Sequence, residues 1–102
     1  MKIRNIHALA EVQYDLDDGE AFYEMQSPGL GQYFRDSLLT DLQSLWLYAG
    51  IHSKQFGFYR IHESRFPYSI YYEIINEDVI IAAVLDMRQN PLKTITKLSS
   101  RK

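Results

Sequence analysis

The side chains of this sequence that could do chemistry are mainly cations, and they lie in its second half. Arg60, Arg65, Arg88 and Lys93 are able to bind phosphate or carboxylate groups, and guanidinium does so through a planar fork of donors. His62 lies among them. Acid–base catalysis needs a matched acid and base within reach of one another, and no such pair is evident here. We therefore expect binding from these residues, with an enzymatic role as the less favoured alternative.

Two of the arginines have an alternative role inside the protein. Arg65 could pair with Glu63 or Asp86 and so close the hairpin in which it lies. Arg88 could pair with Asp86, because residues two apart on a strand share a face. An exposed polar group at the end of a strand is, however, often part of a binding site. Asp86 belongs to the same candidate surface, and both roles stay open for each arginine.

Tyrosines are interleaved with these cations. Tyr68, Tyr71 and Tyr72 lie close together on one strand-like segment. Aromatic rings beside cations can stack on nucleic-acid bases, but cross-strand packing with a hydroxyl at the rim is more common. We predict packing for Tyr72, whereas Tyr71 on the opposite face is a candidate for either role.

Other kinds of catalysis find no support in the sequence. The three histidines are widely separated and include no pair four residues apart, so no zinc motif is present. There is no cysteine, which removes thiolate catalysis and disulfides. The PGLG segment at 28–31 follows a predicted helix rather than a strand, unlike a phosphate-binding loop. We expect no metal and no cofactor.

The composition is that of one globular domain over residues 1–102. The chain is 46% hydrophobic and 24% charged, with a formal net charge of −2. Acidic residues exceed basic ones in residues 1–51, and the reverse holds in residues 52–102, so an acidic protein can still present a basic face. No apolar run approaches the ~20 residues of a membrane helix, and the N-terminus lacks the apolar core of a secretion signal. We expect a cytoplasmic protein without a membrane partner.

The first half of the chain predicts a short strand and two helices. Residues 2–6 alternate in polarity, as in a strand. Apolar residues three and four apart predict one helix over about 9–25 and a second over 30–49, with Trp46 in the core between helix and sheet. The short segment 27–31, SPGLG, joins the two helices. Helices with so short a link are expected to form an antiparallel hairpin.

The second half predicts a three-stranded antiparallel meander. Its residues are rich in Tyr, Phe, Ile and Val, which favour strands. The predicted strands are 58–62, 68–75 and 79–87. Pro91 ends the last strand, and a basic tail follows over about 92–102. Helices followed by strands indicate the α+β class, with the helical hairpin on one sheet face and the other face partly open to a ligand or partner.

Three stretches then stand out: FYEMQSPGLGQYF at 22–34, RFPYSIYY at 65–72 and VIIAAVLDMRQNP at 79–91. Together they resemble the ParE/RelE superfamily of small toxins from type II toxin–antitoxin systems, closest to its ParE-like plasmid-stabilisation branch. The resemblance implies the same fold, with two helices on a mainly antiparallel sheet. Many relatives carry a histidine near the position of Asp86, and an aspartate where this sequence has Asn90.

The resemblance also implies a toxin that a cognate antitoxin neutralises. Two activities are known in such systems: inhibition of DNA gyrase by binding, and cleavage of mRNA on the ribosome. We expect gyrase inhibition. The alternatives are an mRNA endonuclease of the RelE type and a non-toxic binding module with the same fold, and a homodimer is possible.

The two activities would use overlapping residues. A nuclease would need Arg60, Arg65 and Arg88 to converge on one concave surface, with His62 or Tyr71 within reach. The candidates for binding an antitoxin or a target are Arg60, Arg65, Tyr71, Asp86, Arg88 and Lys93.

Overall fold

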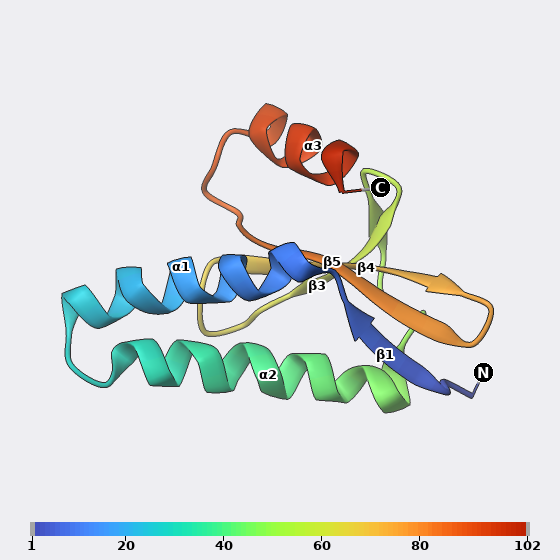
Figure 1. The fold of residues 1–102 in the computed structure, drawn as a ribbon, viewed down its shortest axis with the longest axis horizontal. Helices are drawn as coiled ribbons and strands as arrows, with labels where there is room; N and C mark the ends of the chain where they lie inside the picture. Colours follow the sequence, from blue (N-terminus) through green and yellow to red (C-terminus); the bar gives the residue numbers. More distant parts are fainter. Residues whose placement is uncertain (1, 102) are drawn as a thin grey trace.

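A five-stranded sheet carries two helices on one face and a third helix on the other (Figure 1). The computed structural model describes residues 2–101. Its elements in chain order are β1 (Asn5–Ala8), α1 (Ala10–Gln26), α2 (Leu30–Tyr48), β2 (Lys54–Gln55), β3 (Phe58–His62), β4 (Tyr68–Ile75), β5 (Asp78–Asp86) and α3 (Pro91–Ser100). The predicted α+β class is confirmed. Within the described residues, no helix has the length and apolar character needed to cross a membrane.

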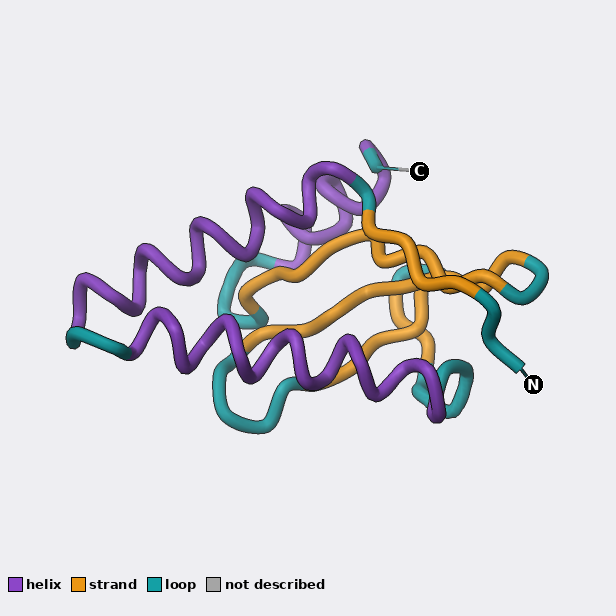
Figure 2. The backbone as a smooth tube through the Cα atoms, turned by 60° about the horizontal axis from the view of Figure 1, so that its bottom comes forward, coloured by secondary structure: helices purple, strands orange, loops and turns teal. Residues whose placement is uncertain are grey.

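The hairpin of α1 and α2 depends on a close approach between the two helices. A methyl group added at Gly19 would lie 2.5 Å from the Phe34 ring, so only glycine fits there. The Glu24 carboxylate accepts hydrogen bonds from the backbone N–H groups of Gly29 and Gly31, both at 3.0 Å. These bonds satisfy free donors at the start of α2. The predicted hairpin is thus confirmed, and its helices run side by side from this turn (Figure 2).

The sheet has the strand order β1-β5-β4-β3-β2. β3, β4 and β5 pair antiparallel as predicted. β1 pairs in parallel with β5, beginning at Asn5 opposite Asp78, so the strand predicted at 2–6 lies slightly further along the chain. β2 pairs with the start of β3. The sequence does not predict β2, because two residues are too few for a periodic pattern.

The larger core lies between the helical hairpin and the sheet. Phe34, Leu38 and Leu45 of α2 are fully buried in it. Tyr72 of β4 is also fully buried there, which confirms its predicted packing role. The prediction for Trp46 is wrong, since 49% of its surface is exposed. It directly follows the buried Leu45, and one residue turns the helix by about 100°, which carries the indole off the buried stripe.

The predicted basic tail is instead the helix α3, which lies over the second face of the sheet (Figure 1). Asn90 Oδ1 accepts a hydrogen bond from the Leu92 backbone N–H at 2.9 Å, and Pro91 occupies the first turn. The smaller core on this face contains Leu98 and buried side chains of the strands, namely Phe58, Tyr71, Ala82, Ala83 and Leu85. The second face is therefore less open than the sequence suggests.

The end of α3 is fixed to α1 by a buried ion pair. Arg101 donates to both carboxylate oxygens of Asp15, at 2.5 and 2.9 Å, and neither side chain is more than 10% exposed. The same carboxylate accepts the backbone N–H of Val84 at 3.0 Å. Arg101 also donates to the carbonyl oxygen of Ala82 at 3.2 Å. One pair of side chains thus joins α1, β5 and α3.

Candidate functional site

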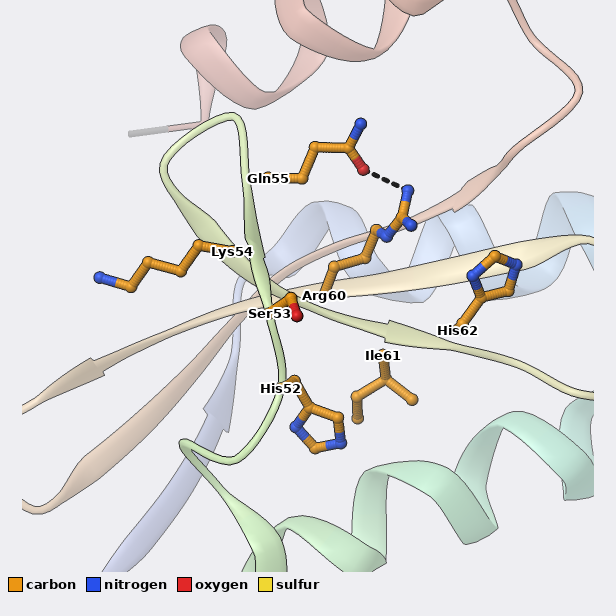
Figure 3. A pocket seen from close by; sticks show the side chains of 7 residues that line it. All are labelled: His52, Ser53, Lys54, Gln55, Arg60, Ile61 and His62. Atoms are coloured by element: carbon orange, nitrogen blue, oxygen red, sulfur yellow. Dashed lines mark hydrogen bonds between the residues drawn. The ribbon is translucent and has the colours of Figure 1, made fainter.

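Three of the predicted site residues lie on the side of the β3–β4 pair that faces α3. Arg60 is directly opposite Tyr71 in the register, and His62 follows two residues later on the same strand. Alternate residues of a strand share a face. Figure 3 shows this arrangement, with Arg60 and His62 on one side of β3 and Ile61 on the other.

Arg60 borders a groove of about 680 Å³ beside the outer edge of β3. Its lining residues are His52, Ser53, Lys54, Gln55, Arg60, Ile61 and His62 (Figure 3). Arg60 Nη1 donates a hydrogen bond to Gln55 Oε1, and the Arg60 backbone N–H donates to the carbonyl oxygen of Ser53 at 3.0 Å. Both the backbone and the side chain of Arg60 are therefore held by the β2 segment.

Tyr71 does not present its ring to solvent. It is only 3% exposed and belongs to the core beneath α3, together with Phe58 and Leu98. Phe56 also approaches it, with 6.5 Å between the ring centroids. Of the two roles open to Tyr71, the structure favours packing.

Arg65 lies in the loop between β3 and β4 and pairs with Glu63. Its guanidinium is 3.7 Å from Glu63 Oε1, and its backbone N–H donates to the same oxygen at 2.7 Å. The Glu63 side chain is fully buried. Of the two partners predicted for Arg65 inside the protein, the structure therefore selects Glu63, although 46% of the arginine side chain remains exposed.

Asp41 of α2 adds a second carboxyl group to this junction. Burial, together with the hydrogen bond and the negative charge of Glu63, raises the pKa of Asp41 to about 7, and Arg65 opposes the shift. A carboxyl group that is buried beside another negative charge is harder to ionise, which is why its pKa rises. This junction, which we call the carboxyl pair, joins α2 to the β3–β4 loop, and no local pattern in the sequence predicts it.

Asp86 and Arg88 form a bidentate ion pair at the end of β5. Arg88 Nε lies 3.0 Å from Asp86 Oδ1, and Nη2 lies 2.8 Å from Oδ2. Burial by itself would raise the pKa of Asp86, but the hydrogen bonds and charge of Arg88 outweigh it and lower the pKa. The guanidinium also lies 6.0 Å from the centre of the Phe22 ring. Because 56% of the Arg88 side chain is exposed, the predicted internal pair leaves room for an external contact.

Lys93 lies in the first turn of α3 and is exposed. It borders a shallow hollow with Leu92, Thr96 and Lys97. This places it on the outer side of α3, whereas Thr94 and Leu98 face the sheet.

The arginines that a nuclease of the RelE type would require do not converge. Arg60 points to the α3-facing side of β3. Arg65 occupies the β3–β4 loop, and Arg88 follows β5. Each of the last two is held by its own carboxylate. What the structure brings together is Arg60 and His62 beside the groove.

The sequence does not predict a contact between His52 and Tyr72 near the groove. His52 Nδ1 lies 2.6 Å from the Tyr72 hydroxyl, which accepts a hydrogen bond from the Gly50 backbone N–H at 3.0 Å. Burial lowers the pKa of His52, which favours the neutral form of the ring. Within residues 2–101, no group of three or more potential ligands is placed to hold a metal ion.

The likeness of this chain to known proteins lies in its three-dimensional structure. No family model matches the chain, and no curated protein matches it. A solved chain from the chromosomal ParDE TA system of P. aeruginosa aligns with a TM-score of 0.75 at 14% sequence identity. The alignment covers 84% of this chain and 98% of that chain. The fold implied by the sequence resemblance is therefore confirmed.

Proposed function

We propose that this protein is the toxin of a type II toxin–antitoxin system, that it acts in the cytoplasm by binding and inhibiting DNA gyrase, and that a cognate antitoxin neutralises it. The observation that carries the proposal is the likeness in fold to a chain of a ParDE system, which extends over 98% of that chain. The three sequence stretches that resemble ParE-like toxins support it independently.

The arrangement of the candidate residues supports action by binding rather than catalysis. Arg65 and Arg88 are each paired with a carboxylate yet about half exposed. Their segments meet at one end of the sheet, where the Met87 backbone N–H donates to the Pro67 carbonyl oxygen at 2.8 Å. Phe22, 46% exposed, lies beside Arg88 at this end. Cations fixed beside an exposed aromatic ring are well suited to a protein interface.

Tightly controlled expression in a bacterial host without antitoxin tests the proposal. New DNA and new protein are pulse-labelled after induction. The proposal predicts an early arrest of DNA synthesis, which Arg88→Gln weakens. The matched control is Arg4→Gln, which removes the same charge from an exposed arginine at the opposite end of the sheet.

The same experiment separates the alternatives. Early arrest of protein synthesis would contradict gyrase inhibition and favour the mRNA endonuclease, for which Arg60 and His62 beside the groove are the supporting observation. Normal growth with folded protein present would favour a non-toxic binding module.

A further inference from the structure

The arginines of this protein differ in how their charge is compensated. Within residues 2–101, four of them have a carboxylate within 4.0 Å: Arg35, Arg65, Arg88 and Arg101. Arg4 is exposed, and water solvates its charge. Arg60 is half-buried, and no described carboxylate lies within 4.0 Å of it.

Moving a charged side chain partly out of water costs free energy that an ion pair normally offsets, and Arg60 has no carboxylate partner of this kind among the described residues. The side-chain partner of Arg60 is the neutral amide oxygen of Gln55. Guanidinium has five N–H donors, and this bond uses one of them. Arg60 therefore keeps both its charge and most of its donors for another group.

The groove beside Arg60 supplies the space and further donors. Its volume is about 680 Å³, and no described residue that lines it is acidic. His62 lies on the same side of β3 as Arg60, while Ser53 and Gln55 lie on the segment alongside (Figure 3). An imidazole, a hydroxyl and an amide thus border the space that Arg60 faces.

We propose that this groove is a phosphate-binding site centred on Arg60, which takes a phosphate monoester or diester. A phosphate group has several acceptor oxygens in a tetrahedral arrangement, and it can use a guanidinium and neutral donors from different directions. A single carboxylate would occupy the guanidinium fork alone and leave the other donors of the groove unused. This inference does not depend on the function proposed above.

The test follows backbone amide resonances of the full chain during titration at fixed ionic strength. The probes are inorganic phosphate, adenosine monophosphate and a single-stranded uridine octanucleotide. We expect saturable shifts at residues 53–55 and 60–62 with at least one probe. Saturation by inorganic phosphate identifies a site for small anions, whereas saturation by the octanucleotide alone identifies one for phosphodiesters.

Matched variants decide whether Arg60 is responsible. Arg60→Gln is expected to weaken binding about tenfold or more, since hydrogen bonds to charged groups are among the strong ones. Arg60→Lys keeps the charge but loses the fork, so its binding should lie between those of the wild type and Arg60→Gln. Arg4→Gln should bind like the wild type. Unchanged resonances from the helical hairpin establish that each variant is folded.

Three outcomes would overturn the proposal. The first is the absence of saturable shifts at the groove with all three probes. The second is an equal loss of binding in Arg60→Gln and Arg4→Gln, which would indicate general electrostatic attraction. The third is tighter, Arg60-dependent binding of a glutamate-rich peptide that phosphate does not displace, which would make the groove a site for carboxylates.

Discussion

The two faces of the sheet are closed in different ways. On the hairpin face, two long helices bury a large core with many aromatic contacts, such as Phe34 against Tyr68 at 4.8 Å between ring centroids. On the other face, α3 is held by a small core around Leu98 and by the ion pair between Arg101 and Asp15. The hairpin face therefore depends on apolar packing, whereas the α3 face depends strongly on one pair of charges.

This difference also separates the candidate binding regions. Arg65 lies in the β3–β4 loop and Arg88 follows the end of β5. The charge of each is compensated by a carboxylate. Arg60 lies on the α3 face beside a groove, with a neutral partner. Compensated arginines stabilise the protein and can still contact a partner, whereas an uncompensated one is more suited to holding an anion.

The largest effect should come from breaking the hairpin core. Phe34→Ala removes a fully buried ring that packs on Phe66 and Tyr68. We expect the free energy of unfolding to fall by about 3–5 kcal/mol, measured by chemical denaturation. Leu47→Ala on the same helix is the control, because Leu47 is 81% exposed, and its effect should stay within about 0.5 kcal/mol. Equal effects for both variants would contradict the packing described here.

The next largest loss of stability should come from breaking the Asp15–Arg101 ion pair, and it should be confined to the α3 face. Asp15→Asn leaves the Arg101 charge buried without its partner, and we expect a loss of about 3 kcal/mol. Hydrogen exchange should increase most in α3 and less in the hairpin. Asp18→Asn, an exposed change on the same helix, is the control. Uniform acceleration of exchange across the chain would show that the two faces unfold together.

A smaller effect should be seen in how the free energy of unfolding depends on pH, through Asp41 of the carboxyl pair. The pKa of Asp41 rises from 3.8 to about 7 on folding, so the folded protein holds a proton that the unfolded chain has released. This contribution to stability is complete below about pH 4 and is lost as the pH rises through 7. Relative to Asp41→Asn, the wild type should lose about 1–2 kcal/mol over this range, after allowance for partial exposure.

The measurement for Asp41 is chemical denaturation at several pH values between 4 and 8. Asp36→Asn is the control, because Asp36 is exposed on the same helix. If the wild type and Asp41→Asn show the same dependence on pH, folding does not raise the pKa of Asp41.

The smallest effect on stability should come from Arg88→Gln. Its ion pair with Asp86 is largely exposed on the arginine side, and such pairs contribute about 0–1 kcal/mol. A small loss of stability combined with a large loss of toxicity would separate binding from folding at this residue. A loss of stability above about 2 kcal/mol would contradict the view that the pair lies at an accessible surface.

Much of the fold follows from local patterns in the sequence. The repeating apolar spacing predicts both helices of the hairpin, and the alternation over residues 68–75 predicts β4. Helix α3 is missed because Thr and Ile are weak helix formers and the lysines suggest a solvated tail. Asn90 followed by Pro91 is the signal that could have revealed it, as a capping residue and a first-turn proline.

The candidate site is predictable only where its partners are close in sequence. Arg65 with Glu63, and Arg88 with Asp86, are two residues apart, so the sequence can suggest them. Arg101 and Asp15 are 86 residues apart, and nothing local connects them. Among the described residues, Arg60 has a neutral side-chain partner and no carboxylate within 4.0 Å. This depends on the strand register and on β2, neither of which a local pattern determines.

Inhibition of DNA gyrase is tested most directly by adding the purified protein to a supercoiling reaction on relaxed plasmid. We expect the wild type to stop supercoiling in a concentration-dependent way. Arg88→Gln should need a higher concentration for the same effect, and Arg4→Gln should not. Complete supercoiling in the presence of a large excess of folded wild-type protein would show that the protein does not inhibit gyrase.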